Sequence, residues 1–206
     1  MAFCELKYHS KALGKALAAD LILPQNDAPG PFAVFYLLHG LSDDHTIWQR
    51  RTSIERYVAE YPLIVVMPDS GRGFYCDAQE GDAWETAIIR DLVGYVDKLF
   101  QTRTGREGRC IGGLSMGGYG ALKLALKFPD MFCSAVSHSG AVARAHSPIP
   151  AKPGDRFQAE MRRISFCLRT TRRVPSRCST CCTGCPMTTP SGSGGRASSD
   201  MSRSIR

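Results

Sequence analysis

The chain has 206 residues and a formal net charge of +7 at pH 7, with 43% hydrophobic and 22% charged side chains. This length suits one domain or a small enzyme. The charge sits at one end, because residues 165–206 carry +6 from seven arginines and one acid, whereas residues 1–164 carry +1. We therefore expect neither nucleic acid nor a membrane surface as a partner of the main body.

Targeting and metal-binding signals are also missing from the main body. The N-terminus has no basic start, apolar stretch and small-residue cleavage site of the kind that a secretory signal needs. The longest apolar run, residues 32–38, is much shorter than the roughly 20 residues that span a membrane. We expect a soluble, cytoplasmic protein. The four cysteines of residues 1–164 lack the spacing of metal ligands; they are Cys4, Cys76, Cys110 and Cys133.

Taken in chain order, the first half alternates strands with a helix. Residues 11–23 predict an early strand that Pro24 stops. Residues 32–38 are continuously apolar, which predicts a strand covered on both faces. A helix is expected over residues 46–60, and a second buried strand over residues 63–67.

The second half continues this alternation. Five apolar residues at helical spacing predict one buried helix stripe; they are Trp84, Ile88, Leu92, Tyr95 and Leu99. Residues 109–114 predict a strand, residues 120–128 a helix and residues 133–137 a further strand. Strands alternating with helices indicate an α/β fold with a mostly parallel sheet flanked by helices.

Parallel sheets bind ligands at the carboxyl ends of their strands. That rule selects four positions as candidates for the functional site: residues 39–41, residues 68–70, Ser115 and residues 137–140.

The segment Gly113-Leu114-Ser115-Met116-Gly117 matches the G-x-S-x-G pattern of a nucleophilic serine. A serine on a tight strand-to-helix turn needs Gly113 and Gly117, because side chains there would collide with neighbouring backbone. The helix behind the turn would direct the Met116 N–H toward an oxyanion. Short glycine patterns also arise in ordinary turns, but the predicted strand and helix on either side favour the nucleophile.

A second oxyanion donor is expected from the loop after an earlier strand of this fold. The segment at residues 39–41 stands at such a position, which makes the Leu41 N–H the candidate. We interpret His39 as a structural histidine that shapes this loop.

Three separated motifs, at residues 37–48, 65–69 and 112–121, together resemble the esterase D group of α/β-hydrolases, which includes S-formylglutathione hydrolases and tributyrin-type esterases. The resemblance covers roughly residues 5–164. It implies Ser115 as nucleophile, an oxyanion hole from the Leu41 and Met116 N–H groups, and no cofactor. It also implies that Trp48 and Glu85 steady the loops of the site, although the residues alone fit plain packing and surface roles equally well.

The acid and histidine of a catalytic triad are not evident. After Ser115 the chain offers only two histidines, His138 and His146, and four acids, which are Asp130, Asp155, Glu160 and Asp200. In the resembled family the acid follows a later strand and the histidine a strand later still, so we expect both to be absent and the sheet to be incomplete at the C-terminus. We interpret His138 as a loop residue.

Residues 165–206 have a different composition from the rest, since 22 of the 42 are Ser, Thr, Gly or Pro. Such a segment buries too little apolar surface to fold. We expect a disordered or non-native tail, and hypothesise a frameshift near residue 164. Its two adjacent C-x-x-C pairs, at residues 178–185, lack the intervening chain that a zinc site needs, so no metal is expected.

These observations predict a serine carboxylesterase or thioesterase that hydrolyses short acyl esters through an acyl-serine, impaired if the triad acid and histidine are absent. Two alternatives stay open. One is a truncated domain without catalysis, and the other is an acyltransferase of the same fold.

Overall fold

The computed structural model describes residues 1–25, 27–78 and 81–142. The predicted boundary after residue 164 and the tail beyond it lie outside this part of the chain. No helix within the described residues is long and apolar enough to cross a membrane.

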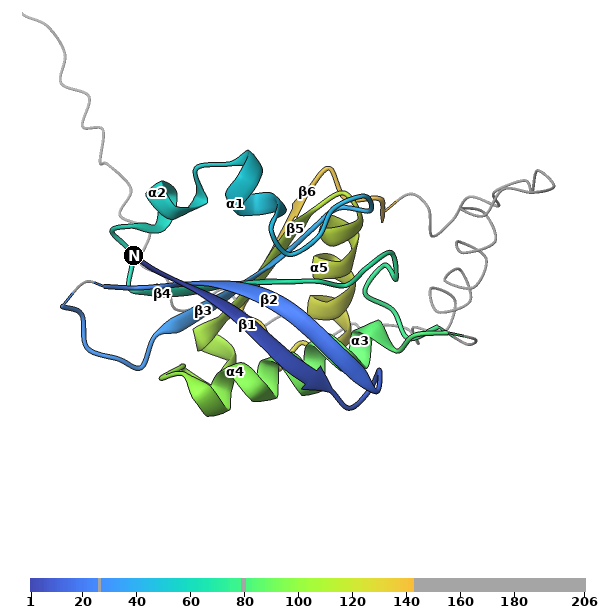
Figure 1. The fold of residues 1–206 in the computed structure, drawn as a ribbon, viewed down its shortest axis with the longest axis horizontal. Helices are drawn as coiled ribbons and strands as arrows, with labels where there is room; N and C mark the ends of the chain where they lie inside the picture. The colour runs from blue at the N-terminus through green and yellow to red at the C-terminus, as the bar shows by residue number, and fades with distance from the viewer. Residues whose placement is uncertain (26, 79–80, 143–206) are drawn as a thin grey trace, which may run out of the picture. The chain divides into compact units, whose positions relative to one another are not determined.

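One mixed sheet organises the described residues (Figure 1). Its order is β1-β2-β4-β3-β5-β6, with bounds Ala2–Ser10, Lys15–Leu23, Leu63–Pro68, Ala33–Leu38, Arg109–Leu114 and Ser134–His138. The β1–β2 and β2–β4 pairs are antiparallel, and the β4–β3, β3–β5 and β5–β6 pairs are parallel. The predicted, mostly parallel α/β sheet is confirmed.

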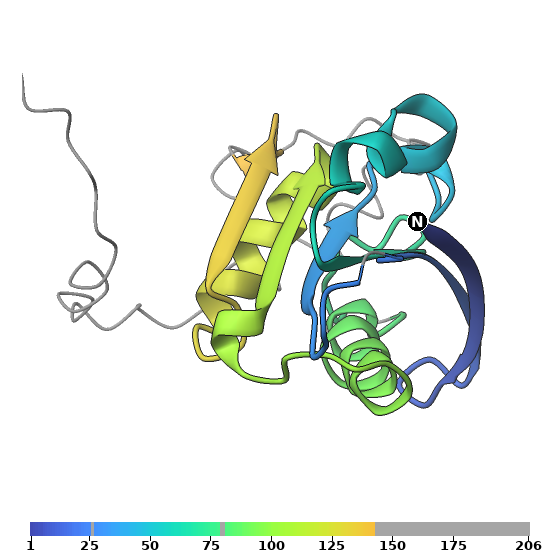
Figure 2. The same cartoon turned by 90° about the vertical axis from the view of Figure 1, so that its left-hand side faces the viewer.

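Helices cover both faces of this sheet. Their bounds are α1 Ile47–Arg51, α2 Ile54–Val58, α3 Trp84–Thr86, the π-helix η1 Ala87–Leu92, α4 Val93–Leu99, the 3-10 turn η2 Arg106–Gly108 and α5 Met116–Lys127. Helices α1 and α2 lie on one face, and α3, α4 and α5 on the other. Figure 2 shows α5 against β5 and β6, and α4 on the concave side of the curved β1–β2 hairpin.

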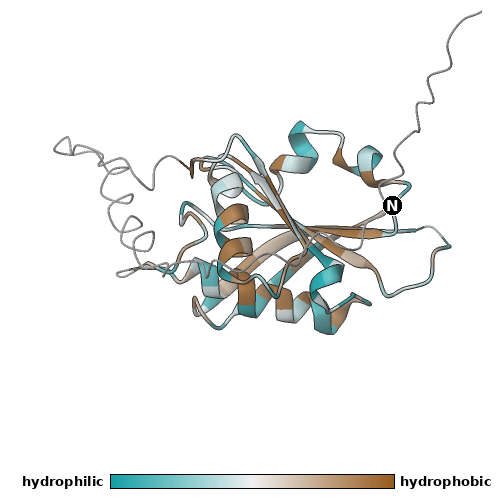
Figure 3. Cartoon of the chain, turned by 180° about the vertical axis from the view of Figure 1, so that it is seen from behind, coloured by the Kyte–Doolittle hydropathy of each residue, from teal (hydrophilic) through white to brown (hydrophobic). Residues whose placement is uncertain are grey.

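The alternation of side chains along each strand divides the core in two. In β3, Tyr36 and Leu38 join the large cluster under α3, α4 and α5, while Leu37 joins Ile54 and Val58 of α2 on the opposite face. Figure 3 shows hydrophobic residues concentrated along the strands, with both hydrophobic and hydrophilic positions on the helices. Strand β3 is therefore covered on both faces, as its continuous apolar run predicts.

The N-terminal strand prediction was wrong in extent. Residues 11–23 form a turn followed by β2, and β1 was not predicted at all. Gly14, with φ +63°, closes the turn that joins the two strands. The Asp91 carboxylate of η1 fixes this turn by accepting hydrogen bonds from Ser10 Oγ (2.6 Å) and the Ala12 N–H (2.9 Å).

The helix predicted over residues 46–60 is two short helices. They are separated at Thr52, whose backbone is extended, with φ −136° and ψ 172°. Thr52 and Ser53 have low helix propensity, and hydroxyl side chains compete for backbone hydrogen bonds, which explains the break.

The stripe predicted from Trp84 to Leu99 holds for its first three residues only. Tyr95 is 39% exposed and Leu99 51% exposed, whereas Val93 and Val96 are buried. The π-helix η1 contains Ile88 and Leu92, and its wider i→i+5 turn shifts the buried face that follows it by one residue, from Tyr95 to Val96. The prediction failed at Tyr95 and Leu99 because it assumed an uninterrupted α-helical period.

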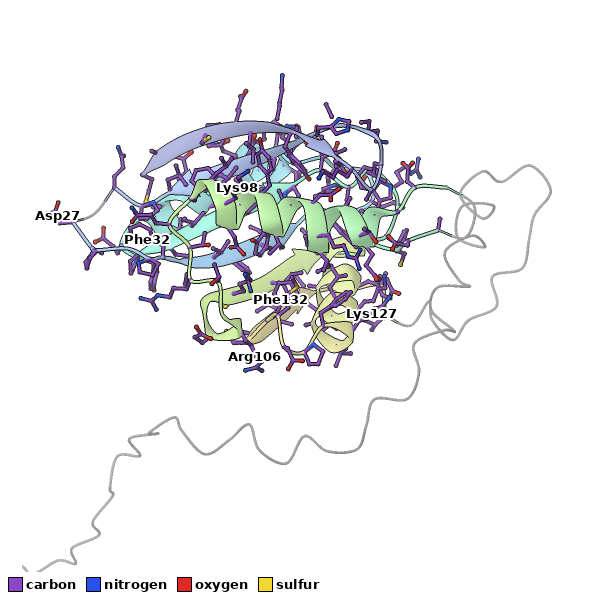
Figure 4. The ribbon with its side chains drawn as sticks, turned by 90° about the horizontal axis from the view of Figure 1, so that it is seen from below. Asp27, Phe32, Lys98, Arg106, Lys127 and Phe132 are labelled. Atoms are coloured by element: carbon purple, nitrogen blue, oxygen red, sulfur yellow. The ribbon has the colours of Figure 1, made fainter. Side chains whose placement is uncertain are left out.

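Helix α5 begins at Met116, four residues earlier than predicted. Three glycines in its first turns lower the intrinsic helix propensity, but tertiary packing overrides this. The helix ends at Lys127, and the chain returns to β6 past Phe132, labelled in Figure 4. The Phe132 ring packs edge-on against Tyr36 with centroids 6.3 Å apart. This return places the end of β6 beside the start of α5.

Candidate active site

Ser115 stands on the turn between β5 and α5 in a conformation that non-glycine residues rarely adopt. Its backbone has φ 53° and ψ −109°, and the residue is exposed. The Ser115 N–H donates to the carbonyl oxygen of His138, at the end of β6, across 2.9 Å. The hydroxyl is thus presented at the carboxyl edge of the sheet by a strained, well-anchored turn.

The two glycines of the motif leave no room for a side chain. A Cβ at Gly113 would lie 2.5 Å from the Gly117 carbonyl carbon, and one at Gly117 would lie 2.3 Å from the Leu38 carbonyl oxygen. These neighbours are backbone atoms that cannot rotate away. The close approach of α5, β5 and the end of β3 therefore depends on glycine at both positions.

The predicted oxyanion donors come from adjacent strand ends. Strands β3 and β5 are hydrogen-bonded neighbours with Leu38 opposite Gly113, so the segment at residues 39–41 leaves the sheet next to the Ser115 turn. Met116 is the first residue of α5, and its N–H has no partner within the helix. The structure thus brings the Leu41 and Met116 segments to one edge beside Ser115.

His39 is buried, and its imidazole forms hydrogen bonds with its own loop and with the loop after β4. Its Nε2 accepts the Ser70 N–H at 3.0 Å, which assigns the ring proton to Nδ1, and Nδ1 then donates to the Gly40 carbonyl oxygen at 2.7 Å. The Gly40 carbonyl and the Leu41 N–H belong to the same planar peptide group. His39 therefore fixes the orientation of the Leu41 N–H, in line with its predicted structural role.

The loop after β4 contributes a residue that sequence reasoning missed. The Tyr75 hydroxyl donates to the His39 carbonyl oxygen at 3.0 Å, and the Tyr75 ring is fully buried. Phe74 and Tyr75 both have positive φ, at 50° and 55°. The available signal was an aromatic pair in a glycine-rich loop at a strand end, which alone does not distinguish packing from function.

Glu85 and Trp48 occupy different surroundings. Glu85 is only 5% exposed, so the alternative of a surface role is wrong for it. Its carboxylate binds Lys123 Nζ and Lys127 Nζ of α5, each at 2.5 Å; Lys127 is labelled in Figure 4. Trp48 is partly buried and packs on the smaller apolar cluster beneath α2. Glu85 thereby ties α3 to the helix that follows the candidate nucleophile.

The described part of the chain contains no side chain hydrogen-bonded to the Ser115 hydroxyl. His138 contacts Ser115 through its backbone carbonyl oxygen. Asp130 is exposed and follows the C-terminal end of α5, whereas Ser115 precedes the N-terminal end. The other candidate acids and histidine lie outside the described residues; they are His146, Asp155, Glu160 and Asp200. Within residues 1–25, 27–78 and 81–142, no group of three His, Cys, Asp or Glu could hold a metal ion.

Residues 10–171 match the model of the esterase family described as "Putative esterase". Among solved structures, the chain is similar to FphF, a fluorophosphonate-binding serine hydrolase of Staphylococcus aureus, with 34% identity and a TM-score of 0.66 over 72% of this chain and 62% of that one. It is also similar to an S-formylglutathione hydrolase (FrmB) of the same organism, with 31% identity and a TM-score of 0.66 over 82% of this chain and 67% of that one.

Curated relatives include Esterase Rv1288 of Mycobacterium tuberculosis, 34% identical over 145 residues, and an acetyl esterase of Caldicellulosiruptor saccharolyticus, 29% identical over 152 residues. The first match covers 65% of this chain and 31% of the relative, and the second covers 69% and 57%. The chain therefore spans about a third to somewhat over half of the length of these relatives.

Proposed function

The chain belongs to the esterase family of α/β-hydrolases, and from that premise we propose that it is a serine carboxylesterase or thioesterase acting through Ser115. The observation that carries the proposal is the Ser115 turn. A serine with φ 53° and ψ −109° is held between a buried strand and the start of a helix, with glycines on both sides at positions where a Cβ would collide with backbone. Packing alone does not need a strained serine at this point.

In the proposed reaction the Ser115 oxygen attacks the carbonyl carbon of an acyl ester or thioester. The carbonyl π bond opens to a tetrahedral oxyanion, which accepts hydrogen bonds from the Leu41 and Met116 N–H groups. The alcohol or thiol then leaves with a proton, and water cleaves the resulting acyl-serine. The first step requires a general base to take the Ser115 proton, and the last returns a proton to Ser115.

We propose short acyl groups as the substrate class. An acetyl esterase and S-formylglutathione hydrolases are among the similar proteins, and their names denote a short acyl ester and a short acyl thioester. No cofactor takes part in this chemistry, and the chain's own groups supply nucleophile and oxyanion donors.

The test uses the purified full chain and its Ser115→Ala variant with an aryl acetate and an acetyl thioester of a small thiol. We expect a rate with wild type that the variant lacks, and an acetyl group on the Ser115 peptide by mass spectrometry. A rate that persists in Ser115→Ala would place the chemistry elsewhere. Equal background rates and no acylation would refute hydrolysis by this chain, and would agree with the expected absence of a triad acid and histidine.

A further inference from the structure

We propose that Tyr75 is a positioning residue for the oxyanion hole, acting through its hydrogen bond to the backbone of the loop that carries Leu41. The inference rests on the proposed function of Ser115 and adds to it a residue from a different part of the chain. Tyr75 lies in the loop after β4, 34 positions beyond Leu41, and its hydroxyl reaches the His39 carbonyl oxygen at 3.0 Å.

Two consecutive peptide groups of the loop are each held by one buried side chain. Tyr75 binds the carbonyl of the His39–Gly40 peptide, and the His39 imidazole binds the carbonyl of the Gly40–Leu41 peptide at 2.7 Å. Because each peptide group is planar, fixing its C=O also fixes the direction of its N–H. The second of these groups contains the Leu41 N–H, and the imidazole that holds it belongs to His39, whose own carbonyl Tyr75 binds.

The loop needs such restraints because Gly40 links the two peptide groups. Glycine lacks the Cβ that limits backbone rotation, so either peptide could turn over at little steric cost. A Cβ at this position would lie 2.8 Å from Asp43 Oδ2, the end of a side chain that can turn away, and 3.7 Å from the Leu114 carbonyl oxygen, which is an ordinary contact distance. The hydrogen bonds of Tyr75 and His39 supply the rigidity that the glycine removes.

Tyr75 is itself held rigidly on the opposite side. Its carbonyl oxygen accepts a hydrogen bond at 2.9 Å from Lys123 Nζ, which is paired with buried Glu85. Its ring packs directly on α5, where a Cβ at Gly120 would lie 2.4 Å from Tyr75 Cδ2. Its left-handed backbone, with φ 55°, is strained and persists only because these contacts determine it. These contacts therefore fix the position from which the Tyr75 hydroxyl donates to the His39 carbonyl oxygen.

The Tyr75 hydroxyl keeps its proton at neutral pH and can serve as a donor there. Burial raises the pKa of Tyr75 far above its ordinary value, and hydrogen bonding with Ser70 and with the His39 backbone offsets only part of this increase. The proton therefore stays on the oxygen, and the His39 carbonyl, which can only accept, receives it.

The test compares Tyr75→Phe with wild type in hydrolysis of an aryl acetate. Removal of one oxyanion donor lowers kcat by about 100- to 1,000-fold. Tyr75→Phe leaves the Leu41 N–H in place but less well oriented, so we expect a smaller decrease in kcat, of about 10- to 100-fold. KM is expected to change by less than about twofold, because the oxyanion forms only in the transition state. If Tyr75 has a purely structural role, Tyr75→Phe should change the melting temperature without the selective loss of kcat at nearly constant KM.

Tyr8→Phe is the matched control. Tyr8 is buried in β1, and its hydroxyl has no hydrogen-bond partner among the described residues. We expect it to keep wild-type kcat and KM. Tyr75→Phe with wild-type kcat, or with a loss confined to KM, would overturn the positioning role.

A second measurement separates this inference from the proposed function. If wild type shows no Ser115-dependent rate, the function proposal fails, and ¹⁵N relaxation of the Gly40 and Leu41 amides then decides the role of Tyr75. Loss of the restraint predicts order parameters that fall from about 0.85 toward 0.6 in Tyr75→Phe and stay unchanged in Tyr8→Phe. Unchanged order parameters in Tyr75→Phe would overturn the inference.

Discussion

Removing the Glu85 carboxylate should destabilise the protein strongly. Glu85 and Lys123 face each other with side chains only 7% and 6% exposed, and Glu85→Ala leaves the Lys123 ammonium without its counter-charge in that position. Breaking a buried ion pair on one side costs about 3–5 kcal/mol. Lys123 retains its hydrogen bond to the Tyr75 carbonyl at 2.9 Å, so we expect the lower end, about 3 kcal/mol.

Equilibrium unfolding in urea, followed by tryptophan fluorescence, measures this loss. Trp84 is buried directly before Glu85 in α3 and reports the unfolding of that region. With a slope of about 2 kcal/mol per molar urea, a loss of 3 kcal/mol lowers the midpoint by about 1.5 M. Alanine is a good helix former, so the substitution itself does not weaken α3.

Lys127→Ala is the control, because it removes the other cation from the same carboxylate. The Lys127 side chain is 45% exposed, and exposed ion pairs contribute about 1 kcal/mol or less. If Glu85→Ala costs no more than Lys127→Ala, the argument that burial makes Lys123 dependent on Glu85 is refuted.

Three further predictions concern packing and charge. Gly117→Ala places a Cβ 2.3 Å from the Leu38 carbonyl oxygen and should lower the free energy of unfolding by about 3 kcal/mol; tolerance of this change in urea unfolding would contradict the steric argument. Gly94→Ala, in α4 with open space around it, should instead stabilise by about 0.5–1 kcal/mol in the same assay. Hydrogen bonds from Thr46 lower the pKa of Asp44, so its stabilising effect is present above the unfolded pKa of about 3.9 and is lost as pH falls through the lower folded pKa. The melting temperature of Asp44→Asn should therefore lie below that of wild type at pH 5–7 and converge with it at more acidic pH, and a difference independent of pH would exclude this linkage.

The buried strands were predictable because their signals are local. Residues 32–38 and 63–67 are uninterrupted apolar runs ended by turn residues, and they form neighbouring parallel strands in the centre of the sheet. Strand β1 alternates in period two, but Phe3 is exposed and Ser10 is buried, so its pattern does not separate the faces cleanly. The apolar spacing of residues 84–99 did not reveal the π-helix. The prediction therefore placed Tyr95 and Leu99 on the buried face, although both are exposed.

The candidate site divides in the same way. Ser115 and its flanking glycines were predictable because one short turn imposes its steric needs on adjacent residues. The Tyr75 contact joins residues 36 positions apart, and the Glu85–Lys123 pair joins residues 38 apart, so only the folded chain shows them. Glu85 was singled out by resemblance, but nothing local indicated that it is buried.

The backbone of Ser115 also implies a conflict between durability and reactivity. A serine with φ 53° and ψ −109° has a backbone strain energy of about 1–3 kcal/mol, whereas glycine adopts positive φ without this strain. A Ser115→Gly change would relieve that strain while removing the hydroxyl. Selection for thermal resistance alone would thus favour loss of this serine, and its retention in a long-lived lineage would have to come from the chemistry it performs.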